Sequence, residues 1–120
     1  MKLAFVAIAG AAGAVARYTI GRAVGVRSFP WATLLINVVG SAVLGYVLSG
    51  PGAGRWSTTA TTAVAVGFLG AFTTFSTFAY ETTAMLRTDQ PVRAFTYVAL
   101  SVALGLLAAA AGYAVGRATT

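Results

Sequence analysis

The sequence contains no cysteine and no histidine, and only two of its 120 residues are carboxylates, Glu81 and Asp89. Without cysteine there are no disulfides and no thiolate chemistry, and without histidine as well the usual ligands of transition metals are gone. Histidine is also the commonest general acid–base residue. We therefore expect that the protein is not an enzyme, because two carboxylates leave almost nothing for catalysis.

Charged residues of either sign make up only 8% of the chain, whereas hydrophobic residues make up 58%. So few charges cannot cover a globular surface. Long apolar runs separate them, which is typical of a polytopic membrane protein. The net charge of +6 does not indicate nucleic-acid binding, because the basic residues are scattered along the connections and form no stripe.

Four apolar segments, at about 3–21, 31–48, 58–85 and 92–115, are long enough to cross a membrane. They predict an all-α membrane protein with one four-helix transmembrane domain over residues 1–120 and both termini on the same side. The lysine and apolar run at the start also fit a signal peptide. We set that interpretation aside because the later segments are equally apolar.

Glycines at helical spacing predict close helix contacts in the first and fourth segments, as small residues do in membranes. They are Gly10, Gly13, Gly21, Gly25, Gly112 and Gly116, of which Gly21 and Gly25 form a G-x-x-x-G pair. The first segment also contains Arg17. This arginine either extends to the lipid headgroups or lines an aqueous vestibule that attracts anions.

Asn37 lies well inside the second segment, with apolar residues on both sides. An amide in hydrocarbon costs kilocalories per mole unless it finds hydrogen-bond partners. Two interpretations stay open. Asn37 either joins two helices by a hydrogen bond, or its amide donates N–H groups to something negative.

The third segment is longer than the ~20 residues of a straight span. At its centre, Gly67–Phe78 mixes glycine, threonine and serine with phenylalanine, which predicts a helix break near Gly70–Thr73. A break in hydrocarbon is tolerated only where the freed carbonyls find partners. Such carbonyls suit a hard monovalent cation, and two from each protomer on a two-fold axis would suit Na⁺. A kink or close packing without an ion is the alternative.

Phe75 and Phe78 are three residues apart and therefore share a face of the half-helix after the break. Such pairs usually serve packing. The edge of a phenyl ring is nevertheless electropositive, so ring edges, the Asn37 amide and the hydroxyls of Ser76 and Thr77 would also line a narrow path for a small anion. With no fixed cation in that path, the anion would not be trapped.

The basic residues give only a weak signal for orientation. Those on the side of the termini are Lys2, Arg55 and Arg117, and those on the other side are Arg22, Arg27, Arg87 and Arg93. This bias is too small to fix one orientation. Either the chain inserts both ways, which would permit an antiparallel dimer, or the termini face outward.

Three stretches carry a resemblance to a known family: Gly-Ala-Val-Ala-Arg-Tyr at 13–18, Ala-Thr-Leu-Leu-Ile-Asn-Val-Val-Gly at 32–40, and 67–78 followed by Glu81. Together they resemble the fluoride channel family known as Fluc or CrcB. The resemblance implies an antiparallel, dual-topology dimer in a prokaryotic cell membrane, with two pores that export fluoride passively and reject chloride. The dimer would be a homodimer, or a heterodimer with a paired family member.

By position, the resemblance implies that Gly70 and Thr73 give their carbonyls to a structural Na⁺ at the dimer centre, and that Arg17 lies at the vestibule. The pore residues it implies are Asn37, Phe75, Ser76, Thr77, Phe78, Tyr97 and Ser101. Two positions depart from the family pattern. Ala71 stands where glycine is common, and Gly105 stands where some relatives carry serine.

A small proton-coupled multidrug exporter is the alternative function, since such proteins also have four helices and form dual-topology dimers. That mechanism needs a carboxylate in the first span, but residues 3–21 contain none and Glu81 lies toward the end of the third. A non-transporting assembly subunit is a third possibility. It would leave the polar cluster of Asn37, Ser76 and Thr77 unexplained.

Overall fold

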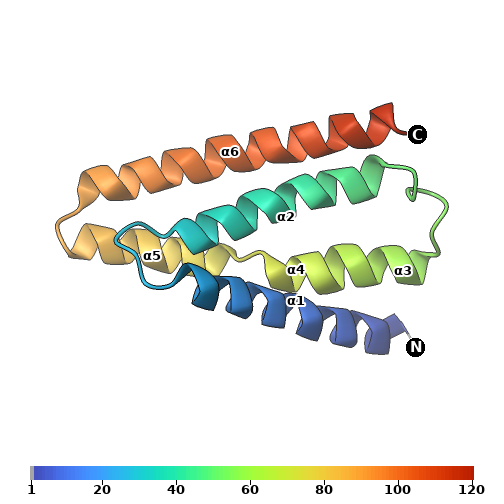
Figure 1. Cartoon of the computed structure of the whole chain (residues 1–120), viewed down its shortest axis with the longest axis horizontal. Helices are drawn as coiled ribbons and strands as arrows, with labels where there is room; N and C mark the ends of the chain where they lie inside the picture. The colour runs from blue at the N-terminus through green and yellow to red at the C-terminus, as the bar shows by residue number, and fades with distance from the viewer. Residues whose placement is uncertain (1) are drawn as a thin grey trace.

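The protein was analysed as a computed structural model that describes residues 2–120. Within that range, four apolar helical segments are long enough to cross a membrane. They lie side by side, and both termini emerge at the same end of the bundle (Figure 1). The prediction of an all-helical protein with an interrupted third segment is confirmed.

The first two segments are the continuous helices α1 (Lys2–Val24) and α2 (Trp31–Ser49), and the fourth is the continuous helix α6 (Pro91–Ala118). The third segment is composite. It consists of α3 (Thr58–Thr62), a π-helical stretch η1 (Ala63–Phe68), α4 (Leu69–Phe72) and, after an interruption, α5 (Phe75–Arg87). A π-helical turn inside an α-helix is uncommon and has no simple sequence signature, and the sequence did not predict this one.

The ends of the helices follow local sequence signals. Gly25 follows α1 with a positive φ of 76°, a conformation that glycine adopts without a steric penalty. Ser57 caps α3, because its hydroxyl accepts a hydrogen bond of 3.1 Å from the amide of Ala60. Pro91 occupies the first turn of α6, where its missing N–H costs nothing.

Helix α1 packs directly on the first half of the third segment through glycines. A Cβ atom on Gly13 would collide with the carbonyl of Phe68. From the opposite side, a Cβ on Gly67 would lie 2.9 Å from the carbonyl oxygen of Val6. The two backbones therefore touch, and we call this contact the α1 seam. It realises the close contact predicted for Gly13.

A second seam joins α2 and α6, the pair of helices with the most extensive contact. A Cβ on any of three glycines would collide across it: Gly45 with Ala109, Gly112 with Ala42, and Gly116 with Ser49. The Ser49 hydroxyl also lies 3.0 Å from the Tyr113 carbonyl, to which it donates. The close contact predicted at the glycines of the fourth segment is therefore present.

The G-x-x-x-G prediction for Gly21 and Gly25 is wrong within the protomer. A Cβ on either residue would meet no atom of the described chain within 4 Å. Gly21 lines the space between α1 and α2 without close contact, and Gly25 serves the turn after the helix. Spacing alone does not separate a packing glycine from a terminating one.

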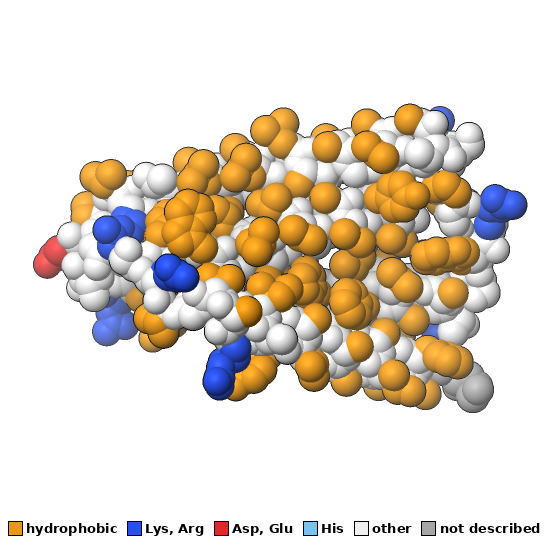
Figure 2. Space-filling model, in the orientation of Figure 1, with side chains coloured by type: hydrophobic (Ala, Val, Ile, Leu, Met, Phe, Trp, Pro, Cys, Tyr) orange, Lys and Arg blue, Asp and Glu red, His pale blue; other side chains and the backbone are white. Residues whose placement is uncertain are grey.

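On the face shown in Figure 2, hydrophobic side chains cover the middle of the bundle and the charged side chains lie toward its ends. The interior is small. Its buried cluster contains Leu34, Met85, Ala94 and Tyr97. Most apolar residues therefore face outward, as expected of helices whose solvent is lipid or another protein.

Candidate ion-binding and permeation site

The interruption of the third segment consists of two extended residues, Thr73 (φ −83°, ψ 160°) and Thr74 (φ −153°, ψ 119°). The sequence predicted a break near Gly70–Thr73, whereas Gly70 still belongs to α4. The break therefore lies at the carboxyl end of the predicted stretch. Threonine tolerates it because a β-branched residue favours extended backbone.

Asn37 holds the break in place from α2. Its Oδ1 accepts a hydrogen bond of 2.8 Å from the amide of Thr74, and its Nδ2 donates one of 3.0 Å to the carbonyl of the same residue. Both backbone groups that the break exposes at Thr74 are thus satisfied by one side chain, as burial in an apolar medium requires. The interhelical hydrogen bond that the sequence left open for Asn37 is present, and the second N–H of its amide has no partner within residues 2–120.

The side chain of Thr74 starts α5. Its hydroxyl oxygen accepts from the amide of Thr77 at 3.3 Å and donates to the Thr77 hydroxyl at 3.1 Å. This is an N-cap, which satisfies one of the free amides at a helix start. On the other side of the break, the Thr73 hydroxyl donates to the Leu69 carbonyl at 2.9 Å and ends α4.

Arg17 contacts the break from α1. Its Nε donates a hydrogen bond of 3.1 Å to the carbonyl of Ala71, at the carboxyl end of α4. Carbonyls at a helix end carry partial negative charge, which a cation stabilises. Arg17 is half-buried, and this hydrogen bond directs its side chain toward the break. The interruption is therefore fixed by Asn37 of α2, by the Thr74 cap of α5 and by Arg17 of α1.

Two hollows flank the break. One of about 280 Å³ is lined by Asn37, Gly70, Thr73 and Phe75, among others. The other, of about 300 Å³, is lined by residues that include Arg17, Thr33, Thr77 and Glu81. Thr74 lines both hollows. Thr74 at the break therefore separates two recesses that contain polar side chains.

The first hollow offers unused carbonyl oxygens. Within residues 2–120, neither the Gly70 nor the Thr73 carbonyl accepts a hydrogen bond from the chain, and both residues line this hollow. The described residues contain no group of three or more histidine, cysteine or carboxylate side chains that would hold a metal. The chemistry here is that of hard neutral oxygens, which fits a monovalent cation such as Na⁺ and not a transition metal.

Phe75 and Phe78 are neighbours, as their spacing predicts, with ring centroids 5.7 Å apart. Their surroundings differ. Phe75 is 79% exposed and lines the first hollow. Phe78 turns inward, and its ring lies 5.1 Å from that of Tyr97 in an edge-on arrangement. One ring is thus presented to the surface and the other to the core of the protomer.

Tyr97 is 0% exposed, and its hydroxyl donates a hydrogen bond of 2.9 Å to Glu81. Ser76 and Ser101 lie apart from this pair: Ser76 is exposed, Ser101 is partly buried, and neither lines either hollow. Within one protomer, the predicted pore residues are therefore distributed over a surface and an interior and do not close around a single channel.

Sequence reasoning missed the central role of Thr74 and the close contact at Gly40. A Cβ on Gly40 would collide with the methyl group of Thr73, so this glycine lets the break approach α2. The available signals were local. Asn37 and Gly40 lie three apart on one helix face, and Thr74 precedes Thr77 at the spacing of a helix cap.

Four apolar helices and an interrupted span with unpaired carbonyls define the class: a small polytopic membrane protein built to handle ions. Residues 4–113 match the family described as CrcB-like protein, Camphor Resistance (CrcB). The chain belongs to this family.

Curated relatives align over nearly the whole chain. The Fluoride-specific ion channel FluC of Ignicoccus hospitalis is 43% identical over 111 residues, which cover 92% of this chain and 90% of the relative. The Fluoride-specific ion channel FluC 1 of Symbiobacterium thermophilum is 45% identical, with 97% and 98% covered. The FluC of Deinococcus radiodurans is 45% identical, with 93% and 92% covered. These relatives are ion channels and not enzymes.

Proposed function

We propose that this chain forms a fluoride-selective channel that exports fluoride passively and so lowers its concentration and toxicity in the cytoplasm. The near full-length similarity to proteins named as fluoride-specific channels carries the proposal. The multidrug exporter considered above gains no support from these relatives. In this proposal the chain is one transmembrane domain over residues 1–120 in the cell membrane of a prokaryote.

The functional unit in this proposal is an antiparallel dimer, formed by two copies or by this chain and a paired family member. Two observations support a partner: one protomer encloses no channel, and the carbonyls of Gly70 and Thr73 lie unpaired in an open hollow. A second copy related by a two-fold axis would bring four such oxygens together. They would hold a structural Na⁺, which neutralises the carbonyl dipoles and is not itself transported.

The anion path would use groups that donate hydrogen bonds or present positive ring edges. Asn37 and Phe75 both line the first hollow, and neutral donors bind a small anion without trapping it. The other residues proposed for the path are Ser76, Thr77, Phe78, Tyr97 and Ser101. Arg17 would attract anions at the vestibule while its Nε donates its hydrogen bond to the Ala71 carbonyl.

Fluoride efflux from liposomes that contain the purified protein tests the proposal. We expect fluoride release with no measurable chloride release, and a lower fluoride rate for Phe78→Ala, which removes the inward ring. Phe5→Ala on the exposed face of α1 is the control and should match the wild type. Absence of fluoride release from the protein, alone and with its paired family member, would refute the function.

The dimer and its orientation need a separate measurement. A cysteine introduced at residue 120 of this cysteine-free chain can be labelled with an impermeant reagent in intact cells and again after permeabilisation. Dual topology predicts that about half of the chains are labelled from outside. Labelling of all chains from one side only would exclude an antiparallel homodimer and leave the heterodimer.

A further inference from the structure

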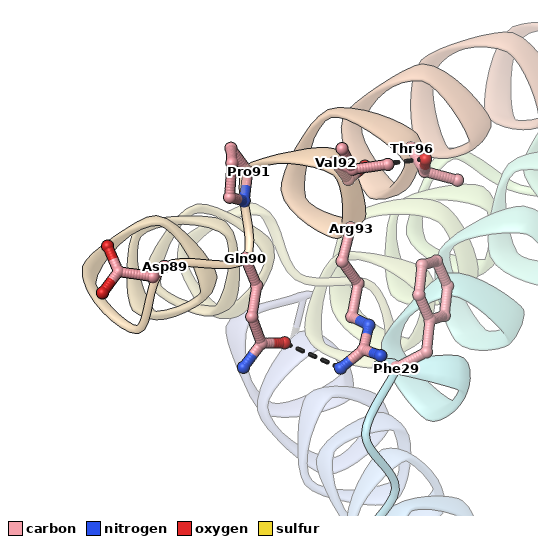
Figure 3. Close-up of a pocket in the computed structure, with 7 residues that line it drawn as sticks. All are labelled: Phe29, Asp89, Gln90, Pro91, Val92, Arg93 and Thr96. Carbon is pink, nitrogen blue, oxygen red and sulfur yellow. Dashed lines mark hydrogen bonds between the residues drawn. The ribbon is translucent and has the colours of Figure 1, made fainter.

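A cavity of about 500 Å³ lies where α5 turns into α6, at the end of the bundle opposite the termini. Its walls combine the aromatic ring of Phe29 and the aliphatic Pro91 and Val92 with the polar side chains of Gln90 and Arg93 (Figure 3). None of these residues belongs to the break or lines either of its two hollows, and Phe29 also lines a third recess. The cavity stands at the depth where lipid headgroups meet the end of a membrane span.

The guanidinium of Arg93 is held in place in this cavity. Its Nη1 donates to Oε1 of Gln90 at 2.7 Å and lies 3.5 Å from the Ser28 carbonyl, to which it also donates. Within residues 2–120, its Nε and Nη2 donate no hydrogen bond. Gln90 itself is held by Thr88, 3.2 Å from its Nε2. An oriented guanidinium with unused N–H groups matches the oxygens of a phosphate.

An apolar stripe leads away from the cavity along α6. Its members are Val92, Phe95, Ala99, Val102 and Leu106, which recur at intervals of three or four residues and therefore share one helix face. Val92 is 79% exposed and Phe95 70%, and the three others are exposed as well. Val92 belongs to both the cavity and the stripe. A ligand with a phosphate at one end and a hydrocarbon chain at the other would fit both together.

The charge around the cavity favours an anion. Asp89 is the one carboxylate in its lining, and Figure 3 shows its side chain pointing away from the Gln90–Arg93 pair. The connection after α1 carries Arg27, α5 ends at Arg87, and the chain as a whole has a net charge of +6. Basic residues near a membrane surface attract anionic lipids.

We propose that this cavity is a binding site for an anionic glycerophospholipid, with the phosphate on Arg93 and an acyl chain along the α6 stripe. The lipid would bridge the turn between α5 and α6 and hold the end of the third segment against the fourth. In an antiparallel dimer the two sites would lie in opposite leaflets. The proposal does not depend on fluoride conduction, since it concerns a surface outside the break.

Native mass spectrometry of the delipidated protein, titrated with phosphatidylglycerol or phosphatidylcholine of equal chain length, tests the site. We expect phosphatidylglycerol to bind more tightly, and Arg93→Gln to weaken it about tenfold, the loss of one charge-assisted contact. Arg117→Gln is the matched control: it removes the same charge at the other end of the bundle and should leave affinity unchanged. Gln90→Ala, which frees the guanidinium, should give a smaller loss in the same direction.

Several outcomes would overturn the proposal. Equal losses in Arg93→Gln and Arg117→Gln would mean that lipid responds to net charge alone. Equal binding of both lipids would remove the role of the anionic headgroup. Displacement of the lipid by millimolar inorganic phosphate would assign the cavity to a free anion, and a shift from dimer to monomer in Arg93→Gln with unchanged lipid affinity would assign it to a protein contact.

Discussion

The two halves of the third segment are held in the bundle by different means. The first half, through Phe72, lies against α1 with backbone touching backbone at Gly13 and Gly67. The second half begins at Thr74, where hydrogen bonds from Asn37 and the Thr74 hydroxyl fix its start. Close packing determines the distance between the first half and α1, whereas hydrogen bonds determine the direction in which α5 continues after the break.

This difference separates the demands of stability and function. Inside a membrane the hydrophobic effect does not drive helices together, because lipid tails are as apolar as the side chains. Close packing at glycines stabilises the contact through dispersion instead. Hydrogen bonds at a break are directional, and they determine where the carbonyls of Gly70 and Thr73 point. We therefore expect substitutions in the α1 seam to affect assembly and substitutions at the break to affect conduction.

Gly13→Val should have the largest effect, because its side chain would collide with the Phe68 carbonyl across the α1 seam. Overpacking of this kind costs about 1–3 kcal/mol and more where backbone must move. We expect little folded protein, measured as the monodisperse yield on size-exclusion chromatography. Gly21→Val is the matched control, since a Cβ there meets nothing within 4 Å. Equal yields would show that the α1 seam does not hold the first half.

Asn37→Ala should reduce fluoride efflux at least about tenfold while the protein stays folded and dimeric. It leaves the N–H and the carbonyl of Thr74 unpaired, and each unpaired buried group costs about 1–3 kcal/mol. The break would then relax and its carbonyls would turn. Thr19→Val is the control, because its exposed hydroxyl bonds only within its own helix, 2.8 Å from the Val15 carbonyl. If Asn37→Ala conducts fluoride like the wild type, the hydrogen bonds between Asn37 and Thr74 have no role in conduction.

Thr74→Val should lower stability by about 1 kcal/mol, the usual value of an N-cap, and loosen the start of α5. Hydrogen exchange at the amide of Thr77 measures this directly, because that amide donates to the lost hydroxyl. Thr74→Ser keeps the hydroxyl and should behave like the wild type. Thr83→Val is a further control on the exposed face of α5. Unchanged protection at residue 77 would refute the cap.

Arg17→Lys should give the smallest change, a fall of a few-fold in fluoride efflux with normal stability. Lysine keeps the positive charge but cannot reproduce the planar geometry with which Nε reaches the Ala71 carbonyl. Arg17→Gln removes the charge as well and should fall further, with a weaker dependence of the rate on ionic strength. If both variants conduct alike, the charge of Arg17 does not attract the anion.

Which of these features the sequence could predict depends on whether the cause is local. The apolar runs predicted the four helical segments. The small and hydroxylated residues after Gly67 predicted the break to within a few residues. The partner of Asn37 could not be predicted, because Thr74 is 37 positions away in the chain. The π-helical stretch at Ala63–Phe68, which packs on α1, was also missed, because such a turn has no simple sequence signature.

The site was predicted in the same uneven way. Spacing placed Phe75 and Phe78 side by side, yet it could not tell that one ring faces outward and the other contacts Tyr97. Helical periodicity assigns residues to a common face but does not say what lies opposite that face. The same limit explains the error at Gly21, which has the spacing of a contact glycine but no atom within 4 Å of the position of its missing Cβ.

Both termini leave the bundle at the same end, which restricts how two copies can be joined in one gene. A duplication that fuses the end of one copy to the start of the next by a short linker would insert both copies in the same direction. An inverted pair on a single polypeptide would need one additional membrane-crossing segment between the copies. The even number of spans in this chain therefore determines which tandem architectures can reproduce an antiparallel assembly.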